Sequence, residues 1–154
     1  IILPKVLPQS LKVFECDGCD IIIPPILNEG LEIWKCFSNS GIIIPNVLPQ
    51  SLKEFDCSLC DLTVLPNIDG IEKLWCEYNK NITLPPVFPS SLKYVNLDYC
   101  DLTSFPILNE GLEEFWCSGN RRAKIESFPK SFRWLNDRGD LNNRRQYPEF
   151  SWWE

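Results

Sequence analysis

One short pattern recurs along almost the whole chain, and no other feature of the sequence restricts the fold as strongly. Leu-Pro-Gln-Ser-Leu-Lys occurs at 7–12 and again at 48–53, and Ile-Leu-Asn-Glu-Gly-Leu-Glu occurs at 26–32 and again at 107–113. A copy of about 20 residues is too short to bury its own apolar side, so stable copies must stack on one another. The repeat therefore predicts a solenoid of stacked coils, numbered here by the apolar residues that begin each copy of the pattern: Leu11, Leu31, Leu52, Ile71, Leu92, Leu112 and Phe132.

Within each coil, the apolar positions predict one short strand. Counting from the anchor, the fourth residue is apolar in all seven coils, and in the first six the sixth is Cys or Leu and the ninth is Asn or Cys. We expect a parallel strand around the fourth to sixth positions, with neighbouring strands about 4.8 Å apart. The return half of each coil is rich in Pro, which fixes φ and lacks a backbone donor, so we expect extended or polyproline geometry there and little helix. This divides the chain into a solenoid at 1–135, with about six full coils and a seventh strand, and a C-terminal piece at 136–154.

The pattern resembles that of leucine-rich repeat proteins. Their Leu-x-x-Leu-x-Leu-x-x-Asn-x-Leu signature is similar to Leu31-x-x-Trp34-x-Cys36-x-x-Asn39 and to its counterparts in the fourth and sixth coils. The short period and the apolar-Pro segments resemble the shortest class, which is best known from secreted bacterial effectors. The resemblance covers about residues 3–135 and implies an α/β-horseshoe type of solenoid that is mostly β, with its binding surface on a concave strand face. It specifies a fold far better than a function.

A second period of two coils is superimposed on the first. Odd coils read Ser-Leu-Lys followed by Cys-x-x-Cys-Asp, or Leu-x-x-Cys-Asp in the fifth coil, whereas even coils read Gly-Leu-Glu or Gly-Ile-Glu followed by Cys-x-x-Asn. Stacked strands bring equivalent positions close together, so we expect the charges at the second position to pair and to oppose a slip of one coil. Their sign alternates without exception along Lys12, Glu32, Lys53, Glu72, Lys93, Glu113 and Arg133.

The eight cysteines are explained by the repeat better than by chemistry. Five occupy the sixth position and three the ninth, and both positions are expected to point inward. There, Cys acts as a small hydrophobe or a weak hydrogen-bond donor in place of Asn. The Cys-x-x-Cys pairs at 16–19 and 57–60 lie two coils apart, too far for one tetrahedral zinc site. Buried structural thiols are therefore the favoured reading, with a disulfide or a metal or redox site as the alternatives, and they indicate a reducing, intracellular compartment.

Composition excludes several functional classes. The chain has no His, which removes Ser-His-Asp and Cys-His catalysis. Residues 1–120 carry 7 Lys and Arg against 16 Asp and Glu, a balance that argues against a nucleic-acid groove. No apolar run approaches the roughly 20 residues that span a bilayer. We therefore expect no enzyme activity, no cofactor, no metal, no nucleic acid and no membrane insertion.

The outward positions of the strands are the expected site of function. Aromatic residues gather there in the fourth to sixth coils, with acids beside them, and such residues often provide interface energy. We predict a protein–protein interaction module whose partner offers a basic or aromatic-accepting surface, although packing of the aromatics among themselves is the alternative. The predicted partner-binding residues are Trp75, Tyr78, Tyr94, Tyr99, Trp116, Asp56, Glu77, Asp98 and Glu114.

Residues 121–154 carry 8 Lys and Arg against 5 Asp and Glu, and the C-terminal piece at 136–154 contributes three arginines and several aromatic residues. The first residues of the chain match the end of a preceding coil. The tail is expected either to cap the last coil or to dock on another chain. This leads to a second hypothesis, a structural subunit held in a larger assembly by an open N-terminal edge and by the tail. If the chain belongs to an effector or a virus, the resemblance implies the host cytoplasm. The predicted docking residues of the tail are Arg144, Arg145, Phe150, Trp152 and Trp153.

Overall fold

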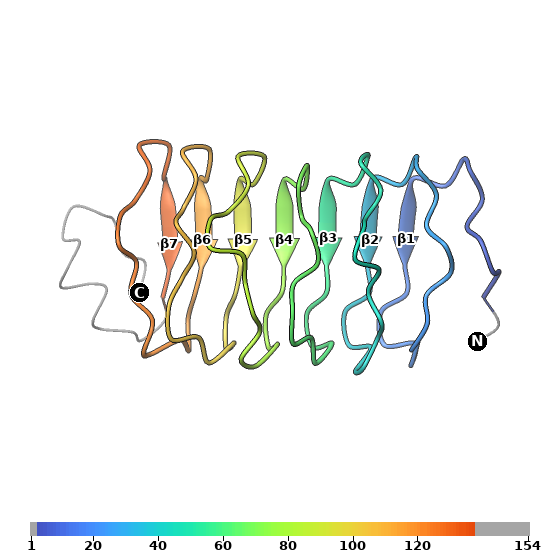
Figure 1. The fold of residues 1–154 in the computed structure, drawn as a ribbon, viewed down its shortest axis with the longest axis horizontal. Helices are drawn as coiled ribbons and strands as arrows, with labels where there is room; N and C mark the ends of the chain where they lie inside the picture. Colours follow the sequence, from blue (N-terminus) through green and yellow to red (C-terminus); the bar gives the residue numbers. More distant parts are fainter. Residues whose placement is uncertain (1–2, 138–154) are drawn as a thin grey trace.

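Seven short parallel strands form a single sheet whose strand order follows the chain, β1-β2-β3-β4-β5-β6-β7. The computed structural model describes residues 3–137. Figure 1 shows the strands side by side along the long axis, each joined to the next by a return segment that runs alongside the sheet. The predicted stack of coils is therefore confirmed as a β-solenoid of about six turns. The strands are β1 Val13–Glu15, β2 Ile33–Lys35, β3 Glu54–Asp56, β4 Lys73–Trp75, β5 Tyr94–Asn96, β6 Glu114–Trp116 and β7 Trp134–Asn136.

The strand register places like positions of the repeat directly beside one another. Phe14 pairs with Trp34, and Trp34 pairs with Phe55. Successive side chains of a strand alternate between its two faces, so the middle residue of each strand points into the solenoid and is buried. Trp34 has no exposed surface and stacks on Phe55 with ring centroids 5.2 Å apart. The core is thus one continuous column of middle-strand and anchor side chains.

The return side has no regular secondary structure in the part of the chain that is described. Isolated parallel bridges join neighbouring coils there, at Val6 with Ile26, Val64 with Thr83, and Val87 with Ile107. No helix occurs between residues 3 and 137, which agrees with the Pro-rich composition of these segments. Accordingly, no helix among those residues is long and apolar enough to cross a bilayer.

The ninth-position asparagines hold neighbouring coils together, as predicted. Asn79 Oδ1 accepts from the backbone N–H groups of Cys60 (3.2 Å) and Leu62 (2.9 Å) in the preceding coil. Its Nδ2 donates to the carbonyls of Cys57 (2.9 Å) and Cys76 (3.0 Å). Asn39 makes the same four kinds of bond. One buried amide therefore satisfies backbone groups of two coils that could not reach water.

The alternating charges form ion pairs between coils. Lys12 lies 2.9 Å from Glu32, and Arg133 lies 3.7 Å from Glu113. Glu72 is shared, with Lys53 Nζ at 3.7 Å and Lys93 Nζ at 3.2 Å from its carboxylate oxygens. All these side chains are substantially exposed, so each pair contributes about 0–1 kcal/mol and acts more on register than on stability.

Candidate interaction surface

Four aromatic side chains form a continuous ladder across strands β4 to β7. The ring of Tyr94 lies 5.0 Å from that of Trp75 and 6.4 Å from that of Trp116. Trp116 in turn lies 4.5 Å from Trp134. These four residues, the aromatic ladder, are each partly exposed. The sequence predicted Trp75, Tyr94 and Trp116 as binding residues but not Trp134. Trp134 could have been found from the sequence, because it occupies the outward third position of the seventh coil.

The ladder is diagonal because its members alternate between two repeat positions. Trp75 and Trp116 occupy the fifth position, whereas Tyr94 and Trp134 occupy the third. The register pairs Trp75 with Asn96, so its aromatic neighbour is one step along the diagonal rather than directly opposite. Diagonal neighbours on a sheet are within reach of large aromatic side chains. The rings therefore brace one another while part of each remains at the surface.

Tyr78 and Tyr99 form a second aromatic group, separate from the ladder. Their rings stack with centroids 4.9 Å apart and planes 13° apart. Both residues occupy the eighth repeat position with φ near +57°, a left-handed conformation that is rare for bulky side chains. Gly119 takes the same position in the sixth coil, where a Cβ atom would lie 2.5 Å from Tyr99 Cδ1. Tyr99 is thus held between Tyr78 and a glycine that leaves room for its ring.

One predicted acid does not face solvent. Asp98 was expected to point outward, but it is only 9% exposed. Its Oδ1 accepts from the backbone N–H of Ser118 at 2.7 Å, in the next coil, and its own N–H donates to Asn96 Oδ1 at 2.9 Å. The carboxylate is turned along the stack to satisfy this backbone donor. Asp17 Oδ1 makes the same kind of bond to Phe37 N in the first two coils.

The other three acids remain beside the ladder. Asp56 Oδ1 accepts from Ser58 N at 3.0 Å, Glu77 accepts from the side-chain amide of Asn96, and Glu114 is exposed. Within residues 3–137, none of these carboxylates is in an ion pair with Lys or Arg. In contrast, Glu15 and Glu54 on the same face are neutralised by lysines at 2.7 and 2.8 Å. Among the described residues, the surface around the ladder therefore carries uncompensated negative charge.

The pKa values of Tyr94 and Glu77 are both shifted by burial and by the carboxylates that lie near them. Burial raises the pKa of Tyr94 to about 12, and the charges of Glu114, Glu77 and Asp98 add to that rise. Burial also raises the pKa of Glu77, with a further contribution from the charge of Asp56. Tyr94 is therefore a neutral hydroxyl in an anionic surrounding, a setting that favours a cation.

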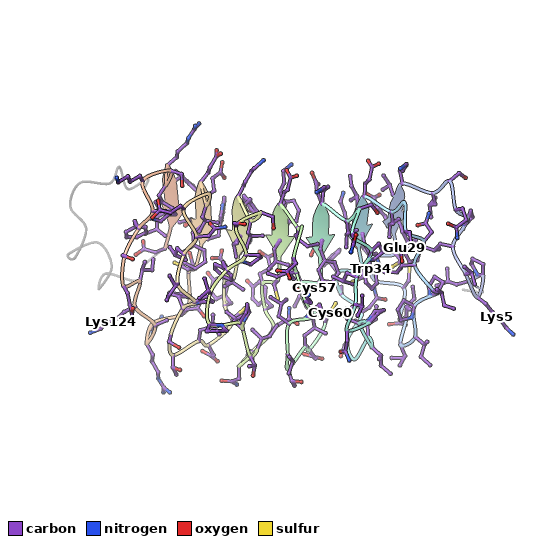
Figure 2. The ribbon with its side chains drawn as sticks, turned by 45° about the horizontal axis from the view of Figure 1, so that its top comes forward. Lys5, Glu29, Trp34, Cys57, Cys60 and Lys124 are labelled. Atoms are coloured by element: carbon purple, nitrogen blue, oxygen red, sulfur yellow. The ribbon has the colours of Figure 1, made fainter. Side chains whose placement is uncertain are left out.

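Seven of the eight cysteines lie inside the stack. All five at the sixth position are buried, as are Cys60 and Cys100 at the ninth, while Cys19 is half-buried. In Figure 2, Cys57 and Cys60 lie within the body of the solenoid together with Trp34, whereas Lys5 and Lys124 project from it near opposite ends. Cys60 Sγ donates to Cys36 O at 3.1 Å, which confirms the predicted substitution of a thiol for Asn. Burial raises the pKa of Cys16 to about 11 and that of Cys100 to about 12, so these thiols are protonated at neutral pH.

The remaining predictions concern metals and the tail. The described part of the chain holds no group of three or more Cys, Asp or Glu side chains arranged to bind a metal ion. The predicted docking residues Arg144, Arg145, Phe150, Trp152 and Trp153 lie outside the described residues.

The fold itself defines the class, a repeat protein built as a parallel β-solenoid with a spacing of about 20 residues. No protein-family model, no curated protein and no solved structure matches the chain.

Proposed function

We propose that this chain is a non-catalytic protein–protein interaction module that binds its partner on the strand face. The observation that carries the proposal is the aromatic ladder of Trp75, Tyr94, Trp116 and Trp134. Trp and Tyr dominate the binding energy of protein interfaces when neighbouring residues hold them rigid. The ladder is braced in this way by ring-to-ring contacts and by a sheet whose register is set by the core.

The partner segment carries Lys or Arg beside an apolar or aromatic group. Support comes from the uncompensated carboxylates of Asp56, Glu77 and Glu114 next to the rings. A guanidinium or ammonium group over an aromatic face gains cation–π energy, and a nearby carboxylate adds directional hydrogen bonds. Charge complementarity of this kind mainly raises the association rate and selects the partner.

Within this proposal, the chain is a leucine-rich repeat protein of the shortest class. Support comes from the inward Leu, Cys and Asn positions, of which Asn39, Asn79 and Asn120 bond the backbone of adjacent coils. Partner recognition on the strand side is the function that the resemblance implies. The buried thiols fit a reducing compartment, where they remain free.

The test uses the full chain as bait under reducing conditions, with extract from its source as prey. Trp75→Ala should reduce retention of the partners at least about tenfold, because it removes the first ring of the ladder. Phe37→Ala is the matched control, since Phe37 is a 39% exposed aromatic on the second coil, outside the ladder. Calorimetry should give the same melting temperature for both variants within a few degrees.

Two results would contradict the proposal. One is that every protein retained by the wild type is retained equally by Trp75→Ala and by Tyr94→Ala. The other is that retention does not weaken in Glu77→Gln or at raised salt, because a basic partner must lose affinity when the carboxylate is removed or screened.

A further inference from the structure

A cavity of about 490 Å³ lies where the turns of the fourth, fifth and sixth coils meet, outside the aromatic ladder. Its wall contains Asn81, Tyr99, Asp101, Thr103, Arg121 and Arg122. Two of these side chains are guanidinium groups in a solenoid whose residues 1–120 are strongly acidic. The concentration of positive charge at one hollow needs an explanation.

The walls of this cavity are held rigidly. Asn120, next to the arginines, donates from Nδ2 to Leu97 O at 2.7 Å and to Cys117 O at 3.0 Å, and accepts from Leu102 N at 3.0 Å. Ala123 N closes the turn onto Asn120 O at 3.0 Å. On the opposite side, Tyr99 is fixed between Tyr78 and the backbone of Gly119. The two arginines therefore extend from a preorganised backbone.

The repeat does not require arginines at this place. The equivalent residues of the other even coils are Ser40 with Gly41 and Lys80 with Asn81. Gly41 and Asn81 are left-handed, with φ of 76° and 57°, whereas the sixth coil has no such residue at that point. In the described chain, neither Arg121 nor Arg122 is in an ion pair, while the cations of the second repeat position lie beside acids. The guanidinium groups are thus free to bind a ligand.

We propose that this cavity binds the phosphoryl group of a phosphorylated side chain on a partner protein. Arginine forks bond phosphate oxygens bidentately, and Arg pairs are a recurring means of recognising phosphorylated motifs. Thr103 and Asn81 add neutral donors, so the wall offers more donors than the two oxygens of a carboxylate would use. Asp101 is the acid in this wall, and its charge opposes the ligand and moderates its affinity.

Inorganic phosphate is the probe, added to the ¹⁵N-labelled full chain at constant ionic strength with chloride as the balancing ion. We expect saturable shifts of the amide signals of Thr103, Gly119, Arg121 and Arg122, with half-saturation in the millimolar range. The double variant Arg121→Gln with Arg122→Gln should weaken binding at least tenfold. Lys80→Gln is the matched control, because Lys80 holds the same repeat position two coils earlier but does not line the cavity.

A second set of measurements separates the phosphoryl group from other anions. Asp101→Asn should tighten phosphate binding severalfold, because a like charge is removed. A peptide with one phosphoserine should bind at least as tightly as inorganic phosphate, and acetate at least tenfold more weakly. The proposal is wrong if the double variant responds like the wild type, if acetate matches phosphate, or if the shifts follow ionic strength alone. None of these outcomes depends on the strand-face ladder, since Trp75→Ala should leave phosphate binding unchanged.

Discussion

Odd and even coils join to their neighbours in different ways at the same repeat position. Asn79, in an even coil, makes four hydrogen bonds, of which three reach back to the odd coil before it and one joins Cys76 O of its own coil. The side chain of Cys60, in an odd coil, reaches the even coil before it through a single bond, from its thiol to Cys36 O at 3.1 Å. A thiol is a weak donor, so the junction that precedes an odd coil is held by less side-chain bonding than the junction that precedes an even coil.

Other contacts follow the same division. Asn28, three residues before the anchor of the second coil, donates to the carbonyls of Pro8, Gln9 and Leu11 around the anchor of the first coil, at 2.9 to 3.0 Å. Asn109, three residues before the anchor of the sixth coil, bonds the carbonyl of Leu92, the anchor of the fifth, at 3.0 Å. The strand-face salt bridges follow the same division. Glu15 of the first coil bonds Lys35 of the second, and Glu54 of the third bonds Lys73 of the fourth. Side chains therefore join the two coils of an odd–even pair more extensively than they join successive pairs, between which Glu77 bonds Asn96 and Ser40 bonds Asp61.

Alkaline pH should give the largest test of this comparison, because five of the eight cysteines belong to odd coils. Burial raises the pKa of Cys16 and Cys100 to about 11 and 12, from 9.0 for an exposed thiol. A raised thiol pKa means that the folded protein keeps its proton longer, so stability is complete below about pH 9 and falls as pH rises toward 11–12. At up to about 1.4 kcal/mol per unit of pKa, these two thiols together cost a few kcal/mol by pH 11, with the larger share from Cys100.

Denaturant unfolding under reducing conditions at about pH 8 and pH 11 measures this loss, and hydrogen exchange locates it. Amides at the junctions that precede odd coils should exchange first, because opening such a junction exposes a thiol such as Cys100, whose Sγ lies 3.3 Å from Cys76 O in the fold, and lets it ionise. A free energy of unfolding that stays constant over this pH range would show that the thiols are not buried as described.

Truncating a ninth-position side chain in an even coil and in an odd coil compares the two kinds of junction directly. Asn79→Ala leaves buried backbone groups of Cys57, Cys60, Leu62 and Cys76 without their partner, which should cost about 3–5 kcal/mol. Cys60→Ala, the matched change in an odd coil, removes one sulfur and a weak bond and should cost about 1–2 kcal/mol. Chemical denaturation at neutral pH measures both. Equal losses would mean that coils, not pairs of coils, are the units of stability.

The smallest effect concerns the charges of the second position. Glu72 pairs with Lys53 inside its pair of coils and with Lys93 in the next pair, whereas Glu32 pairs with Lys12 alone. Glu72→Lys should therefore destabilise by about 1 kcal/mol and Glu32→Lys by about half of that, because exposed like charges repel weakly. The difference should shrink in 1 M salt, where the Debye length is about 3 Å. If Glu32→Lys lowers the free energy of unfolding more than Glu72→Lys does, Glu72 does not link one pair of coils to the next.

Much of this molecule follows from pattern alone. Each strand lies within one residue of the predicted segment, and the residues chosen for the core, such as Trp34, Cys57 and Leu97, have no exposed surface. This works because every coil has the same neighbours, so one periodic rule assigns the direction of each side chain. The inward role of Asn39 and the pairing of alternating charges came from the same rule.

The candidate surface was less accessible to such reasoning. Asp98 holds an outward position in the repeat but turns to the backbone of Ser118, and Trp134 joins the ladder although it was not among the predicted partner-binding residues. Tyr78 and Tyr99 were grouped with the ladder, yet they stack apart from it on left-handed turns. These outcomes depend on rotamers and on diagonal neighbours, which a count of repeat positions does not contain.

Periodicity, inward polarity and charge alternation are properties of residue order, so they determine the stacking direction, the register and the buried column before any coordinates are known. The choice of which carboxylates stay exposed, the ladder of rings and the cavity of Arg121 and Arg122 are set by contacts between side chains of different coils. Such contacts form only when the coils stack, because each of them joins side chains of two different coils. The sequence of one coil does not show which side chains of its neighbours it will touch.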